Sequence, residues 1–174
     1  MAALVLFGGG GDLAMRMLLP SLYFLERDSL LPDGLKIIAA ARSEETVPEF
    51  VARTREAVGW DPASWDRLAA RLDYLAVDAT DADSLQAVKD RLDGDDDLTA
   101  FLAVSPSLFG HIVDAMAAAG LAGPRSRIVI EKPVGRDLDS FLEIDEAVRR
   151  AFPEERVFRI DHYLGKETVQ NLIA

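Results

Sequence analysis

Six apolar segments recur along the chain, and polar or helix-like stretches separate them. They cover residues 2–7, 35–41, 72–77, 98–104, 127–130 and 157–160. The first is apolar throughout, and such continuous hydrophobicity is typical of a strand covered on both faces. Helical spacing of apolar residues, or a polar helical pattern, occupies most of the intervals. This alternation predicts one α/β domain over residues 1–174, built as a doubly wound parallel sheet.

Local signals refine some of the predicted helices. Pro20 falls inside the helix expected over residues 13–27 and should kink it or loosen one turn. Ser43 is expected to cap the N-terminus of a polar helix over residues 43–58. Residues 59–70, with two tryptophans, are expected to form a helical insertion. The acidic residues 93–97 are too few for an EF-hand loop and lack its closing glutamate, so they predict a solvated loop.

Charge and composition exclude several classes of function. The 174 residues carry a net charge of −11, which argues against binding to nucleic acid or to an anionic membrane. The chain has no cysteine, so disulfides, thiolate zinc sites and cysteine nucleophiles are excluded. The apolar start of the chain is too short to span a bilayer and follows no basic segment. We therefore expect a cytoplasmic protein.

A cluster of four glycines, Gly8, Gly9, Gly10 and Gly11, joins the first predicted strand to the first predicted helix. With Ala14 it matches G-x-G-x-x-A from Gly9, or the looser G-x-x-G-x-x-A from Gly8. Such a turn lets the backbone approach a pyrophosphate closely, and the helix N-terminus supplies amide donors. The pattern predicts a Rossmann-like dinucleotide-binding domain. The alternative is a glycine turn without a ligand.

The end of the second predicted strand bears on the choice of dinucleotide. A carboxylate at this position would bind both ribose hydroxyls of NAD. Here the strand ends in alanines followed by Arg42 and Ser43, and a guanidinium suits the 2′-phosphate of NADP. The position favours NADP. The alternative is a solvated Arg42 that pairs with Glu44 or Glu45.

Other predicted strands also end in polar or turn-forming residues. Asp78, Ser105, Lys132 and the pair Asp161-His162 occupy these positions, and open α/β sheets bind ligands at the carboxyl ends of their strands. Each residue alone also fits a structural role. The only other histidine, His111, lies within a predicted helix and is taken as structural. Two histidines make no histidine-rich metal site, and the chain has no G-x-S-x-G elbow.

Three stretches together resemble the glucose-6-phosphate dehydrogenase family. They are Gly8-Gly9-Gly10-Gly11-Asp12-Leu13-Ala14, residues 131–138 (EKPVGRDL) and residues 159–167 (RIDHYLGKE). The last stretch is highly specific. The resemblance covers the whole chain but only the coenzyme-binding part of the family's usual length.

The resemblance implies roles for individual residues. The glycine loop with Asp12, Leu13 and Ala14 would hold the pyrophosphate of NADP, and Arg42 its 2′-phosphate. Lys132 would reach both the nicotinamide and the sugar, and the substrate glucose 6-phosphate would be bound from residues 159–174. In that stretch the implied substrate ligands are His162, Tyr163 and Lys166. Asp161 would orient the general base.

That base is a histidine of the family's C-terminal domain, and this chain ends before reaching it. The implied reaction is hydride transfer from sugar C1 to NADP, the first step of the pentose phosphate pathway. We expect the chain alone to bind the cofactor and to turn over negligibly. The family oligomerises largely through the domain that is absent here, so this chain is expected to be a monomer or to expose an apolar surface.

Met15 and Met17 stand where the family usually has lysines, which removes charge beside the pyrophosphate turn. Two alternatives stay open. One is an oxidoreductase of the glucose–fructose oxidoreductase type, which also carries Glu-Lys-Pro after its fifth strand. The other is a noncatalytic NADP-binding module.

Overall fold

The structure, a computed structural model, describes residues 2–58, 61–92 and 97–161 of the chain. Three of the predicted substrate ligands, His162, Tyr163 and Lys166, lie outside these residues, as does most of the acidic run at 93–97. Within the three ranges, no helix combines the length and the apolar composition needed to cross a membrane.

The strands form one parallel sheet in the order β3-β2-β1-β4-β5-β6. This confirms the predicted doubly wound fold, in which the chain builds outward from β1 in both directions. The order reverses at β1, which pairs with β2 on one side and with β4 on the other. The strands are β1 (Ala2–Phe7), β2 (Lys36–Ala41), β3 (Leu72–Ala76), β4 (Asp97–Leu102), β5 (Arg127–Glu131) and β6 (Val157–Ile160).

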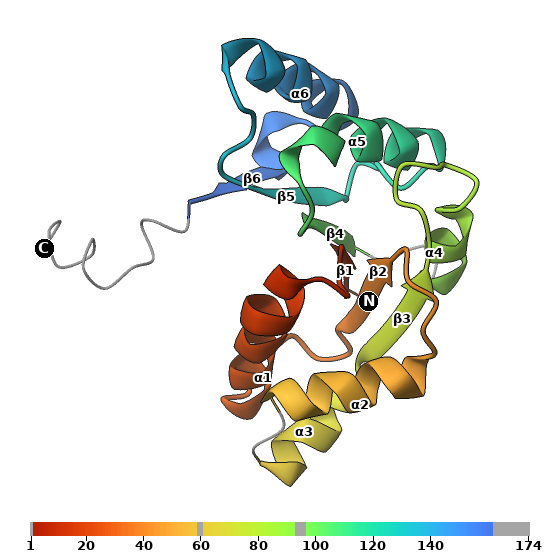
Figure 1. Cartoon of the computed structure of the whole chain (residues 1–174), viewed down its shortest axis with the longest axis vertical. Helices are drawn as coiled ribbons and strands as arrows, with labels where there is room; N and C mark the ends of the chain where they lie inside the picture. Colours follow the sequence, from red (N-terminus) through yellow and green to blue (C-terminus); the bar gives the residue numbers. More distant parts are fainter. Residues whose placement is uncertain (1, 59–60, 93–96, 162–174) are drawn as a thin grey trace, which may run out of the picture.

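Helices cover the sheet from two sides (Figure 1). One side packs a buried cluster that includes Leu6, Ile37 and Tyr74 of the sheet against α1 (Leu19–Arg27), α2 (Val47–Val58) and α3 (Pro62–Ala69). The other side packs Phe7 and Ile130 against α4 (Gln86–Arg91), α5 (Phe109–Ala118) and α6 (Leu138–Ala151). Burial on both faces explains why the strands are apolar without alternation.

Pro20 has the predicted effect on the first helix. The turn before α1 is wound as a π-helix, η1 (Ala14–Leu18), and the Leu19 N–H donates to the Ala14 carbonyl five residues earlier. Pro20 itself lies in the first turn of α1. A proline ring crowds the carbonyl four residues before it, and the wider π turn relieves that crowding.

The predicted N-cap of α2 was wrong. Thr46 caps this helix: its side chain approaches the Glu49 N–H at 3.4 Å, and the Glu49 carboxylate accepts from the Thr46 N–H at 2.8 Å. These contacts form a T-x-x-E capping box, a signal that is visible in the sequence. The Ser43 side chain is instead hydrogen-bonded to the hydroxyl of Tyr74, a residue of β3, at 2.7 Å.

Aspartates cap the starts of two further helices. Asp61 caps α3 within the expected insertion, and Asp137 caps α6 through a capping box with Ser140. A 3₁₀ turn, η2 (Pro106–Leu108), precedes α5, and another, η3 (Glu154–Arg156), precedes β6. Several apolar side chains on α6 and β6 are exposed, namely Leu138, Leu142, Phe158 and Ile160.

Candidate functional site

The glycine turn leaves β1 and folds back against the end of β2. The N–H groups of Gly8 and Gly9 both donate to the Ala40 carbonyl, at 2.8 and 3.2 Å, and the Gly11 N–H donates to the Gly8 carbonyl at 2.9 Å. The turn is therefore tied to two strands and to itself before the helix begins. This tight connection places the start of that helix at the carboxyl edge of the sheet.

Two of the glycines are required by the geometry. Gly8 has φ of +82°, in the region that side chains with a Cβ rarely adopt. A Cβ on Gly9 would lie 2.8 Å from the Leu6 carbonyl oxygen and 2.7 Å from the Ala39 Cβ. The first contact is with backbone, which cannot rotate away. Gly9 is thus the position at which the turn packs directly onto β2.

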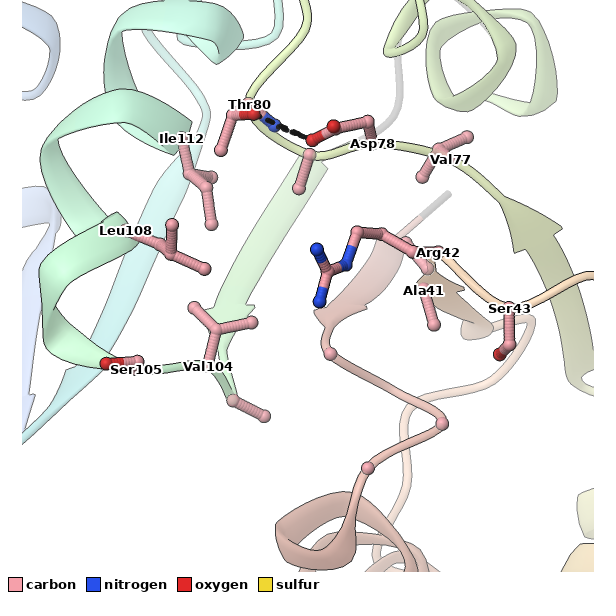
Figure 2. Close-up of a pocket in the computed structure, with 16 residues that line it drawn as sticks. Ala41, Arg42, Ser43, Val77, Asp78, Thr80, Val104, Ser105, Leu108 and Ile112 are labelled. Atoms are coloured by element: carbon pink, nitrogen blue, oxygen red, sulfur yellow. Dashed lines mark hydrogen bonds between the residues drawn. The ribbon is translucent and has the colours of Figure 1, made fainter.

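A cleft of about 510 Å³ opens beside this turn, at the carboxyl ends of β1 to β4. It occupies the point where the strand order reverses, which is where open parallel sheets bind ligands. Figure 2 shows the apolar side chains of Val104, Leu108 and Ile112 facing Arg42 across the space. The lining comprises Gly8, Gly10, Gly11, Ala40, Ala41, Arg42, Ser43, Val77, Asp78, Ala79, Thr80, Ala103, Val104, Ser105, Leu108 and Ile112.

Arg42 supplies the cationic group of the cleft. Its guanidinium extends into the space between the end of β1 and the loop that carries Asp78 and Thr80 (Figure 2). The alternative of a pair with Glu44 or Glu45 is not realised among the described residues, and Glu45 binds Arg53 at 2.6 Å. Among the residues that the structure describes, Arg42 forms no ion pair and no hydrogen bond of its side chain. Its donors therefore remain available to a ligand.

Asp78 faces the same cleft with a fixed carboxylate. Its Oδ1 accepts from the Thr80 hydroxyl at 2.7 Å and from the Thr80 N–H at 2.9 Å. These hydrogen bonds, with a smaller contribution from the charge of Arg42, hold the pKa of Asp78 below its usual range. Because the carboxylate stays ionised, it can accept hydrogen bonds from a ligand but repels an anion placed directly against it.

The far end of the carboxyl edge brings Lys132 and Asp161 together. The Lys132 Nζ lies 3.5 Å from Asp161 Oδ2, and the Lys132 N–H donates to the Ile160 carbonyl at 2.9 Å. The Lys132–Pro133 peptide bond is cis. Both residues follow strands that pair in parallel, β5 and β6. Lys132 does not line the cleft beside the glycine turn.

The predicted cofactor residues are distributed unevenly around the cleft. Gly8, Gly10, Gly11, Arg42, Ser43 and Asp78 line it, whereas Gly9 and Ala14 are buried. Asp12 is exposed and Leu13 half-buried.

The sequence analysis missed several residues in and around the cleft. Thr80 fixes Asp78, and Leu108 and Ile112 form a wall of the cleft. Helical spacing places Leu108 and Ile112 on one face, which is a visible signal but one shared with ordinary core residues. Arg53 also escaped notice, because nothing in the polar pattern of residues 43–58 separates it from the exposed Arg55.

Comparison with known proteins identifies relatives over nearly the whole chain. The sequence profile of a family described as "Glucose-6-phosphate dehydrogenase, NAD binding domain" matches residues 5–171. Glucose-6-phosphate 1-dehydrogenase of Mycolicibacterium smegmatis is 44% identical over 98% of this chain. The enzyme of Zymomonas mobilis is 43% identical over 99%. The chain spans 37% of the length of each of these relatives.

Solved structures give the same result. Glucose-6-phosphate 1-dehydrogenase from Mycobacterium avium superposes with a TM-score of 0.88 at 38% identity, over 97% of this chain and 37% of that one. A glucose-6-phosphate dehydrogenase in complex with its substrate glucose 6-phosphate superposes with a TM-score of 0.85 at 28% identity, over 98% of this chain and 38% of that one.

Proposed function

The chain belongs to the glucose-6-phosphate dehydrogenase family, and we propose that it is the part of such an enzyme that binds NADP while glucose 6-phosphate is oxidised to its lactone. The observation that carries this proposal is Arg42, which extends into the cleft beside the glycine turn. A dinucleotide needs both features together, a backbone turn for the pyrophosphate and a charged group at the adenosine end.

The glycine turn suits the pyrophosphate because its shape depends on backbone alone. Gly8, Gly10 and Gly11 line the cleft without side chains that would keep a ligand at a distance. The helix that follows adds amide donors and the positive end of its dipole. Asp12, Leu13 and Ala14 form the start of this segment, and we assign them to the same subsite.

Arg42 and Ser43 are assigned to the 2′-phosphate. A guanidinium presents planar donors that match a phosphate, and the Arg42 side chain is not engaged elsewhere among the described residues. The ionised Asp78 is assigned to the adenosine, where neutral donors are available to it. This division keeps the phosphate next to the cation and away from the carboxylate.

Lys132 and Asp161 are assigned to the end of the site that meets the sugar. The nicotinamide supplies, when bound, an acceptor for the hydride that leaves sugar C1. Lys132, held near Asp161 at 3.5 Å, would bind the sugar, and Asp161 would orient the base that takes the C1 hydroxyl proton. His162, Tyr163 and Lys166 are assigned to the sugar phosphate.

Equilibrium titration of the protein with NADP and with NAD tests the proposal. Wild-type protein is expected to bind NADP more tightly than NAD, and Arg42→Ala to weaken NADP binding by about 10- to 100-fold while leaving NAD binding nearly unchanged. This range corresponds to losing about 1.5–3 kcal/mol from a charged hydrogen bond. Equal weakening of both dinucleotides would contradict the role of Arg42. Absence of binding to either would contradict the proposed function.

A further inference from the structure

A second cation lies next to the glycine turn, on a different element from Arg42. Arg53 projects from α2, and its Nη1 donates a hydrogen bond to the Gly10 carbonyl oxygen at 3.4 Å. It borders a recess that it shares with Gly10 and Ser43, and these two residues also line the main cleft. The recess and the cleft therefore meet at Gly10 and Ser43. Gly10 lies 43 residues before Arg53 in the sequence, and Ser43 lies 10 residues before it.

Gly10 leaves this space open because it has no side chain. A Cβ on Gly10 would lie 3.6 Å from Arg53 Nη2, 3.6 Å from Ser43 Oγ and 3.4 Å from the Ala41 Cβ. A guanidinium, a hydroxyl and the end of β2 thus surround one small volume next to the turn. The Ser43 hydroxyl donates its proton to the Tyr74 hydroxyl, which in turn donates to the Ser43 carbonyl. The guanidinium is therefore the group beside this volume that can donate to a phosphate.

Arg53 is held in place before any ligand arrives. Its Nε and Nη2 donate to the Glu45 carboxylate at 2.9 and 2.6 Å, and its guanidinium carbon lies 5.7 Å from the centre of the Phe50 ring. The neighbouring Tyr74 hydroxyl donates to the Ser43 carbonyl at 2.8 Å. This arrangement leaves Nη1 directed to the turn and lowers the entropy lost on binding.

Charge around the recess gives Arg53 a second effect. Three carboxylates, Glu44, Glu45 and Glu49, line the recess, and Arg53 is the one cation in that lining. Hydrogen bonds from Thr46 lower the pKa of Glu49, so this carboxylate stays ionised. Arg53 offsets one of these charges through its pair with Glu45 at 2.6 Å, and without it a phosphate near Gly10 would meet three carboxylates and no cation in that lining.

We propose that Arg53 is a specificity-determining residue, a second cation that binds the 2′-phosphate of NADP from the side of the glycine turn. The inference rests on the proposed function, because it requires an NADP-binding cleft. NADP preference then depends on two arginines from two elements.

Titration with two small probes, adenosine 2′,5′-bisphosphate and AMP, tests the role of Arg53 without catalysis. Arg53→Gln is expected to weaken the bisphosphate about tenfold and AMP by less than about twofold, because only the first carries a 2′-phosphate. Arg55→Gln is the matched control, since it removes the same charge from the same helix, and it should change neither affinity. Thermal unfolding of each variant verifies that it is folded.

A lysine at the same position separates charge from packing. Arg53→Lys keeps the cation and is expected to recover part of the preference for the bisphosphate. The assignment is overturned if Arg53→Gln weakens both probes equally, if it weakens neither, or if Arg53→Lys behaves as Arg53→Gln does. If wild-type protein binds neither probe nor NADP, the proposed function itself fails, and that result is distinct from a failure at Arg53 alone.

Discussion

The two ends of the carboxyl edge are built by different means. At the β1–β2 end, the glycine turn is held by backbone hydrogen bonds to the Ala40 carbonyl and by direct contact with Ala39. At the β6 end, side-chain charge holds the strand: Arg159 donates to Asp145 at 2.8 Å and to Glu154 at 2.6 Å. One end depends on close packing, and the other on ion pairs.

This difference predicts different sensitivities. Backbone packing responds to the size of a side chain and hardly to salt or pH. Ion pairs at a partly exposed edge strand respond to both. β6 is the last strand of the sheet and pairs only with β5 among the described residues, so fewer packing contacts are available to hold it. The three variants or conditions below test the contrast.

The largest effect is expected at the turn. Gly9→Ala places a Cβ within 2.8 Å of the Leu6 carbonyl oxygen, and the forced shift should lower the free energy of unfolding by about 3 kcal/mol, the upper end for overpacking. NADP binding should be lost with it. Urea unfolding measures the first effect, and dinucleotide titration the second.

Gly110→Ala in α5 is the matched control for this variant. Its Cβ would lie 3.9 Å from the Ala147 Cβ, an ordinary contact, so the free energy of unfolding should stay constant or rise by about 0.5 kcal/mol. A Gly9→Ala protein with wild-type stability and NADP affinity would show that the turn does not depend on this packing.

A smaller effect is expected at β6. Arg159→Gln removes both ion pairs of this strand and should lower the free energy of unfolding by about 1–2 kcal/mol, between the values for exposed and buried pairs. NADP affinity should not change, because β6 lies at the opposite side of β1 from β2 and β3. Arg156→Gln is the control, because the Arg156 side chain, in the same segment, forms no ion pair or hydrogen bond among the described residues. Loss of NADP binding in Arg159→Gln would mean that the two ends are coupled.

The smallest expected effect is a change with pH in the stability difference between wild type and Arg159→Gln. Burial raises the pKa of Asp145, but hydrogen bonds from Arg159 and Arg149 outweigh it and leave the pKa below the ordinary 3.8. The hydrogen bond from Arg159 likewise lowers the pKa of Glu154 below 4.5. A carboxyl with a lowered folded pKa contributes stability that is present above its unfolded pKa and is lost as the pH falls through the folded value.

Wild type should therefore lose its advantage over Arg159→Gln as the pH falls below about 4. Urea unfolding of both proteins at neutral and acidic pH measures this narrowing. The destabilisation caused by Gly9→Ala should be nearly the same at both pH values. If the difference in the free energy of unfolding between wild type and Arg159→Gln stays constant with pH, Arg159 acts through packing.

Much of the site could be predicted from the residues that directly follow the predicted strands. Gly8–Gly11, Arg42 and Asp78 follow strands, and parallel strands bring their carboxyl ends to one edge. Alternation of apolar segments and helices was therefore enough to predict that these residues meet. The cap of α2 was predicted wrongly because Ser43 and Thr46 are both good N-caps, and the contact that engages Ser43 comes from Tyr74, 31 residues away.

The sequence by itself determined the sheet, the turn and the edge at which the cleft opens, because these depend on local hydrophobic patterns and on residues with special backbone freedom. Tertiary structure alone decided the partners of charged side chains that lie on different segments of the chain. Glu45 pairs with Arg53 and leaves Arg42 directed into the cleft, a choice between cations that lie on separate elements. Electrostatic contacts depend on the distance between charged groups in space, and the separation of these residues along the chain does not give that distance.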